Sequence, residues 1–265
     1  MKRYLTLSPR WSDASPDTRT AKHIAMDILR MDGTRLHLVL AALVCLTLCC
    51  GGLYLLENVF VIVPWATLYY DAPTAFYAFD ALYTAVDIGF VVLIACPLIY
   101  GTATVFFATA DGQKLPLSAM FDGFSSAKRY LRAVLIVSAK VLPRALVLML
   151  LVALVRAALG AETLAVALLW WLLSFAALVG GAIVLGLDDT LLPLALSNEA
   201  VGFFKLYRAS LSRCAPRLIR ILRFKLSFLL WGLASVTTLG VLLFSHALPY
   251  FCLTHAVWAD VNDVE

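Results

Sequence analysis

Two cations inside an apolar stretch are the residues with the most evident chemical potential. Lys140 and Arg144 lie four positions apart, so their side chains share one face of a helix. Asp87 and Asp188 lie near the ends of other apolar stretches and could be their partners. A charged side chain within a bilayer is costly, is usually paired, and often lines the pathway of an ion or solute. These four residues are therefore a candidate intramembrane polar site.

No pattern typical of an enzyme accompanies this site. Asp188 and Asp189 could form a carboxylate pair for acid–base chemistry, although solvation of a helix end is the simpler interpretation. His37, His246 and His255 are scattered and form neither an HxxxH nor an HExxH pattern. No Gly-rich phosphate-binding motif is present, and the six cysteines form no CxxC pair. We therefore expect no enzyme activity, catalytic residue, metal or cofactor.

Composition places the chain among membrane proteins. Of its 265 residues, 62% are hydrophobic and 14% are charged, whereas a soluble domain has about 25% charged residues. The net charge is only +4. The basic residues flank apolar stretches instead of covering a soluble face, so we expect no nucleic-acid partner.

Five apolar stretches are long enough to cross a bilayer as helices. They cover residues 36–56, 81–110, 133–159, 163–187 and 226–248. The predicted fold is an all-α, polytopic transmembrane bundle with five spans, or six if residues 249–258 form a separate helix. We divide the chain into a cytoplasmic segment (1–35), a transmembrane domain (36–258) and an acidic tail (259–265).

Two of these stretches have features that bear on the candidate site. Pro97 is expected to kink the second, because its ring removes a backbone hydrogen bond. In the third, either a surface helix continues to Pro143 and the span begins there, or the span begins near Ala133 and Arg144 lies deep. Residues 58–80 are aromatic and contain no Lys or Arg, which is typical of an outer interfacial segment, although they could also form a binding surface.

Amphipathic segments are expected on the cytoplasmic membrane surface. A helix over residues 19–31 would place Ile24, Ile28 and Leu29 on one face, and residues 117–132 and 201–225 combine aromatic and basic side chains. The basic residues predicted to contact anionic lipid head groups are Lys128, Arg129, Arg132, Lys205, Arg208, Arg213, Arg217, Arg220 and Arg223.

The distribution of cations predicts the orientation of the chain. Lys and Arg are concentrated in residues 2–35, 114–144 and 205–225, and are absent from 58–80 and from the tail. With five spans, this pattern predicts a multi-pass protein of the cell membrane with its N-terminus in the cytoplasm and its C-terminus outside.

Short motifs also resemble a known family. They are Pro97-Leu98-Ile99-Tyr100-Gly101, Phe121-Asp122-Gly123-Phe124, Leu226-Ser227-Phe228, Trp231, Thr238-Leu239-Gly240 and Pro249-Tyr250. They are similar to a bacterial multi-pass membrane family known as domain of unknown function 975, over residues 81–258. The resemblance implies an integral protein of the cytoplasmic membrane and implies no activity and no functional residues.

Two functions fit these observations. The first is a non-catalytic accessory, scaffold or envelope-maintenance protein that contacts anionic lipid and has a membrane protein partner or a second copy of itself. The alternative is a small-molecule or ion transporter or channel component that uses the face formed by Lys140 and Arg144.

Overall fold

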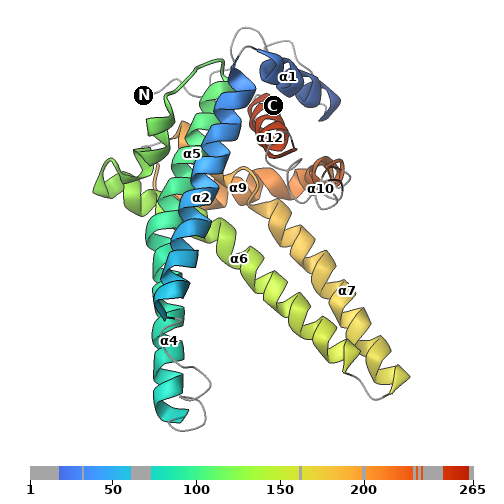
Figure 1. Cartoon of the computed structure of the whole chain (residues 1–265). Coiled ribbons are helices and arrows are strands. Elements are labelled where there is room, and N and C mark those ends of the chain that lie inside the picture. Colours follow the sequence, from blue (N-terminus) through green and yellow to red (C-terminus); the bar gives the residue numbers. More distant parts are fainter. Residues whose placement is uncertain are drawn as a thin grey trace.

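The computed structural model describes residues 18–31, 33–60, 73–160, 163–198, 201–228, 231, 234 and 247–262, and this part of the chain is helical with no strand. The α-helices are α1 (Thr18–Arg30), α2 (Thr34–Phe60), α4 (Pro73–Phe90), α5 (Cys96–Ala110), α6 (Ala127–Leu159), α7 (Leu164–Leu187), α8 (Leu191–Ser197), α9 (Phe203–Cys214), α10 (Leu218–Leu226) and α12 (Leu248–Asn262). The shorter elements are a π-helical turn, η1 (Val91–Ala95), and the 3₁₀ helices η2 (Leu117–Phe124) and η3 (Ala215–Arg217). Figure 1 shows their arrangement.

Four helical stretches among the described residues are long and apolar enough to cross a bilayer. They are Thr34–Leu56, Thr74–Ala110, Ala127–Leu159 and Leu164–Ile183. This confirms an all-helical protein and indicates that it is embedded in a membrane. The predicted fifth span, residues 226–248, lies mostly outside the described residues.

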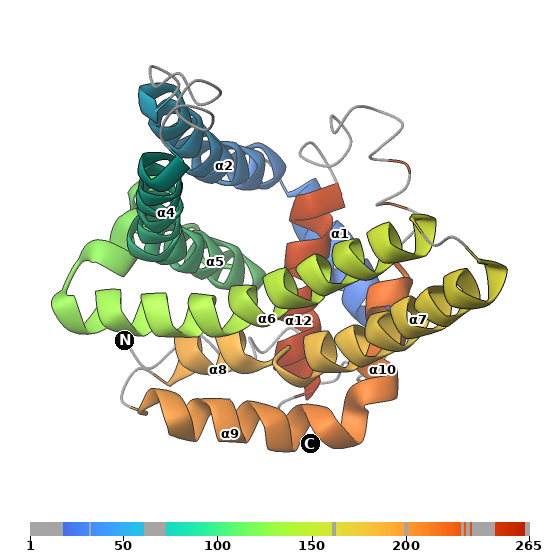
Figure 2. The same ribbon diagram turned by 90° about the horizontal axis from the view of Figure 1, so that it is seen from below.

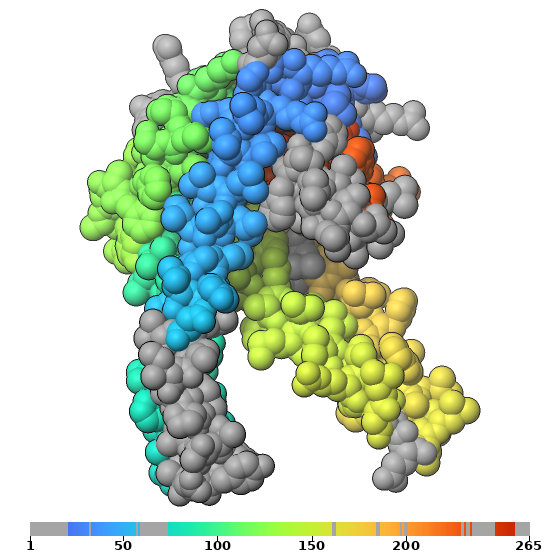
Figure 3. All heavy atoms as spheres, viewed as in Figure 1, coloured from blue at the N-terminus to red at the C-terminus, as the bar shows by residue number. Residues whose placement is uncertain are grey.

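The helices form a head that carries two arms (Figures 1 and 3). The first arm consists of α4 with the facing half of α2, and the second consists of α7 with the part of α6 that follows Arg144. The head contains α1, α5, α8, α12 and the start of α6, while α9 and α10 run crosswise where the second arm joins it (Figure 2). Figure 3 shows an open space between the arms.

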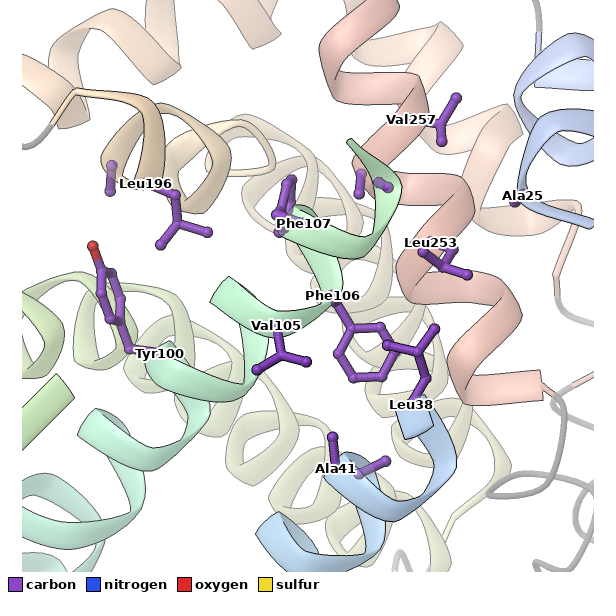
Figure 4. Close-up of a cluster of buried hydrophobic side chains, with 14 of the residues drawn as sticks. Ala25, Leu38, Ala41, Tyr100, Val105, Phe106, Phe107, Leu196, Leu253 and Val257 are labelled. Carbon is purple, nitrogen blue, oxygen red and sulfur yellow. The ribbon is translucent and has the colours of Figure 1, made fainter. Parts of the chain in front are cut away.

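Side chains from several helices build the core of the head. Figure 4 shows Leu253 of α12 close to Phe106 of α5 and Leu38 of α2, and Val257 on the side of α12 that faces Ala25 of α1. All five are buried. These contacts bring the N-terminal and C-terminal helices together, although more than 200 residues separate them.

The contact between α1 and α12 corrects the interpretation of the first amphipathic helix. The helix predicted over residues 19–31 is present, but Ile24, Ile28 and Leu29 are buried in the protein core and do not face a membrane surface. The apolar face of α12 covers them, a partner that the local sequence of α1 could not reveal. In addition, α12 lies in the head beside α1 (Figure 1). The predicted placement of the two chain ends on opposite sides of a membrane stays a prediction.

The second apolar stretch forms a 37-residue helix, Thr74–Ala110, which is about 55 Å long at 1.5 Å per residue. α4, which forms its first part, begins at Pro73, and this corrects the interpretation of residues 58–80, because their C-terminal part belongs to α4. Residues 61–72 lie outside the described part. The first apolar helix also continues beyond the predicted end at residue 56, to Phe60.

The turn before Pro97 has π-helical geometry where a kink was predicted. The N–H of Cys96 donates to the carbonyl of Val91, five residues earlier. A proline cannot donate to the carbonyl four residues before it, which here is that of Leu93. The hydroxyl of Tyr130 in α6 donates to this carbonyl at 3.0 Å. The irregular turn η1 therefore provides a contact with α6.

The third apolar stretch begins differently from the prediction. Residues 117–132 do not form one amphipathic helix, because η2 ends at Phe124 and Ser126 caps a new helix by accepting the N–H of Arg129. From there α6 runs without interruption through Pro143. η2 also packs closely on α5. Gly101 of α5 lies against the backbone of Met120, and Gly123 of η2 lies against the backbone of Pro97.

Candidate functional site

The turn that follows α7 connects several helices. It consists of Asp188, Asp189 and Thr190, which are 5%, 3% and 9% exposed, and we call it the hub turn. The interpretation of the two aspartates as a solvated helix end is therefore wrong. Side chains from α6, α9, α10 and α12 cover the turn, and each of these helices makes a polar contact with it.

Arg144 of α6 forms a two-pronged ion pair with the first residue of the hub turn. Its two terminal nitrogens lie 2.8 and 2.9 Å from the two carboxylate oxygens of Asp188. This parallel geometry is the strongest arrangement available to a guanidinium and a carboxylate. The guanidinium also donates to the carbonyl of Lys140. Since Asp188 is the C-cap of α7, Arg144 lies at the level where α7 ends.

Each carboxylate oxygen of Asp189 contacts a side-chain nitrogen. Lys225 Nζ of α10 lies 2.7 Å from Oδ1, and His255 Nε2 of α12 lies 3.1 Å from Oδ2. Lys140 Nζ donates to the backbone carbonyl of the same residue at 3.5 Å. Burial by itself would raise the pKa of Asp189, but His255, Lys225 and Lys140 hold it well below the ordinary value of 3.8. Asp189 is therefore ionised at neutral pH.

Aromatic rings enclose the histidine of this cluster. The His255 ring lies 6.4 Å from Phe107 of α5, 6.1 Å from Phe224 of α10 and 6.2 Å from Phe251 of α12, between ring centroids. Such apolar surroundings strengthen the hydrogen bond between His255 and Asp189, because the effective dielectric constant is lower than in water.

The third residue of the hub turn binds α9. The hydroxyl of Thr190 lies 3.1 Å from Ser210 Oγ and 3.3 Å from Cys214 Sγ. All three side chains are buried. Just before the turn, Gly186 lies against the side chain of Leu218, which brings α10 beside the end of α7.

The structure brings together three of the four residues of the predicted polar site. Lys140, Arg144 and Asp188 meet at the hub turn, whereas Asp87 lies in α4 on the first arm. The Oδ1 atom of Asp87 is buried and has no hydrogen-bond partner among the described residues.

Sequence reasoning missed Lys225, His255 and Thr190 as members of the cluster. Lys225 was visible only as the last cation before an apolar stretch, and no local pattern distinguished His255 from the other histidines. Asp189 was visible as the neighbour of Asp188, but its burial was not.

The predicted lipid-contacting cations fall into two groups. Lys205, Arg208, Arg213, Arg220 and Arg223 are exposed, and Arg217 is partly exposed. They lie on α9, η3 and α10, whose opposite face is buried through Leu206, Ser210, Cys214, Ile221 and Phe224. We call the exposed side of residues 203–226 the basic face.

The cations of α6 have other surroundings. Lys128 is exposed, whereas Arg129 is partly buried and lies near Ser125 and Asp122. Arg132 donates to the carbonyls of Ala195, Asn198 and Val201 at 2.9, 2.6 and 3.1 Å. It therefore fixes the connection between α8 and α9, and its assignment to the lipid-contacting surface is corrected.

The side chains of the hub turn are all engaged in contacts with other helices. Its two carboxylates are buried and paired, and the hydroxyl of Thr190 contacts that of Ser210 in α9. Within the described residues, no group of three or more His, Cys, Asp or Glu side chains is arranged to hold a metal ion. The arrangement fixes the second arm to α9, α10 and α12.

The chain was compared with protein family models, curated proteins and solved structures, and none of them matches it. The resemblance to domain of unknown function 975 thus stays a prediction.

Proposed function

We propose that this protein is a non-catalytic accessory or scaffold protein of the cell membrane. The observation that carries the proposal is the hub turn, where Arg144 and Asp188 satisfy each other while Asp189 is held by Lys225 and His255. Charges that are paired within the protein stabilise its architecture, and they are less available to bind a solute that crosses the membrane. The cations that predicted a transport pathway thus serve to join the arm to the head.

The arms are proposed to lie in the bilayer. α7 has 24 residues, which corresponds to about 36 Å and is enough to cross a hydrocarbon core of about 30 Å. Large apolar side chains on both helices of the second arm are exposed, among them Met149, Leu172 and Phe175. Because Arg144 pairs with the residue that ends α7, we place it at the membrane edge. This corresponds to a third span that begins near Pro143.

The head is proposed to lie in the cytoplasm with both ends of the chain. α10 precedes and α12 follows the stretch 229–246, and both belong to the head side of the arms (Figure 1). A single crossing by that stretch would separate these two helices by a bilayer. We therefore propose four spans in place of the five predicted from the sequence. The basic face, Lys114 and Lys128 then all lie on the cytoplasmic side, as expected from the distribution of cations.

Asp87 supports a second candidate, a transporter or channel component. An unpaired carboxylate oxygen within an apolar helix is costly, and such residues are often functional. In this case Asp87 would be the group that binds a cation or proton, and not Lys140 or Arg144.

The two candidates are separated by a purification and an uptake assay. The tagged protein is purified in a gentle detergent, and everything that accompanies it is identified by mass spectrometry. A stoichiometric protein partner supports the accessory function. If the purified protein reconstituted in vesicles moves an ion or solute, and Asp87→Asn abolishes this movement while Asp80→Asn does not, the accessory function is wrong.

A further inference from the structure

Large apolar side chains are exposed on the basic face. Phe204 is 84% exposed, Ile219 is 71% exposed and Leu226 is 63% exposed. α9 and α10 already bury a complete apolar face against the protein, through Leu206 and Phe224 among others. The three exposed residues are therefore additional to the residues that hold these helices in place.

Each of these apolar side chains is next to a cation in the sequence. Phe204 precedes Lys205, Ile219 precedes Arg220, and Leu226 follows Lys225. Mixed apolar and basic surfaces of this kind are typical of helices that lie in the interface of an anionic membrane. Lys205, Arg208 and Arg223 are exposed and form no ion pair with any residue that the structure describes. Their charges are thus available to lipid phosphates.

The start of α9 is also rich in aromatic rings. Phe203 lies 5.4 Å from Phe204 and 5.9 Å from Tyr207, between ring centroids. Aromatic side chains are enriched at the level of the lipid head groups, where apolar and polar surroundings meet.

The position of the basic face agrees with this composition. α10 lies beside the end of α7 through the contact of Gly186 with Leu218 and the ion pair of Asp189 with Lys225. In Figures 1 and 2, α9 and α10 run across the direction of α2 and α5, at the base of the second arm. A helix at that height and in that direction lies along the surface of a bilayer that contains α7.

We infer that the basic face is an interfacial anchor that inserts Phe204, Ile219 and Leu226 among the lipids of an anionic leaflet. Lys205, Arg208 and Arg223 contact the phosphates around them. This inference rests on the proposed membrane location of the arms. It adds that the head is held against the bilayer by insertion as well as by charge.

The test uses photocrosslinking in the full-length protein. A benzophenone amino acid replaces Phe204 or Ile219, and each protein is reconstituted in nanodiscs of phosphatidylcholine alone or mixed with phosphatidylglycerol. Leu172, exposed on α7, is the control for the membrane location of the arms, and His23, exposed on α1, is the control for the far side of the head. After illumination, lipid adducts are identified by mass spectrometry.

We expect lipid adducts at positions 204, 219 and 172 and none at position 23. The yield at positions 204 and 219 should be roughly fivefold higher or more in the anionic nanodiscs, because several cations contribute, whereas the yield at 172 should not depend on lipid charge. Adducts at 172 without lipid adducts at 204 and 219 would overturn the anchor and leave the membrane location intact. Equal yields at 204 and 219 in both lipids would overturn the preference for anionic lipid. No adduct at 172 would contradict the proposed membrane location itself.

Discussion

Arg144 and Asp188 lie on consecutive helices of one arm and meet with both guanidinium nitrogens against both carboxylate oxygens, at 2.8 and 2.9 Å. Asp188 is almost completely buried, and a third of the Arg144 side chain is exposed. The pair closes the end of the α6–α7 hairpin that is attached to the head. Asp189, next in the chain, extends this attachment to α10 and α12.

Removal of the arginine should destabilise the protein. Arg144→Ala leaves Asp188 buried without its cation, and the partial exposure of Arg144 reduces the loss to about 2–3 kcal/mol. The melting temperature in detergent should fall by roughly 4–10 °C. Arg156→Ala, an exposed position of the same helix, should change the stability by less than about 0.5 kcal/mol. Equal melting temperatures for the two variants would show that the ion pair contributes nothing.

Stability should depend on Asp189 in acid. The pKa of this carboxyl is lower in the folded protein than its ordinary value of 3.8, so the unfolded chain binds its proton first as the pH falls. The stabilisation is complete above that ordinary value and is lost as the pH decreases below it. Melting temperatures between pH 3 and pH 6 should show this loss in the wild type. Asp189→Asn should have a lower melting temperature than the wild type near neutral pH, and its melting temperature should decrease less on acidification. Asp27→Asn, at an exposed position of α1, should show the same pH dependence as the wild type.

His255 should control the docking of the C-terminal helix. His255→Ala removes the contact of α12 with Asp189, while Lys225 keeps the other carboxylate oxygen paired. Hydrogen–deuterium exchange should become faster in Leu248–Asn262 and change little in α7. His23→Ala, at an exposed position of α1, is the matched control. Unchanged exchange in α12 would mean that its apolar contacts alone hold it in place.

A side chain at Gly101 should disrupt the packing of α5 on η2. A Cβ there would collide with the backbone of Met120, which cannot rotate away as a side chain could. We expect Gly101→Ala to cost at least about 2 kcal/mol, by analogy with other overpacked sites. Gly89→Ala is the control, because open space surrounds that glycine within α4, and alanine there should stabilise the helix by about 0.5–1 kcal/mol. Thermal melts of both proteins in the same detergent compare them directly.

The C-terminus should be cytoplasmic. A C-terminal fluorescent protein fusion should fluoresce, and an alkaline phosphatase fusion at the same position should be inactive, because α12 lies with α1 in the head. A phosphatase inserted after Gly160, at the tip of the second arm, is the control and should be active. An active C-terminal phosphatase would restore the five-span topology predicted from the sequence.

The sequence by itself determined the class of the protein and most of its long helices. Apolar length predicted α2 and α7 to within a few residues and the end of α6, because a span is recognised from consecutive residues alone. The pairing of a cation near residue 144 with a carboxylate was also expected, since an isolated charge among apolar residues is too costly to persist.

Only the tertiary structure decided which residues meet. Asp188 and not Asp87 is the partner of Arg144, and Asp189 is buried where a solvated helix end was expected. His255 reaches the hub turn from a helix that starts nearly sixty residues later in the chain. The apolar face of α1 is buried against α12, which lies more than 200 residues later in the chain. Such contacts depend on how the helices pack together, and the spacing of residues within one helix carries no information about the helix that will cover it.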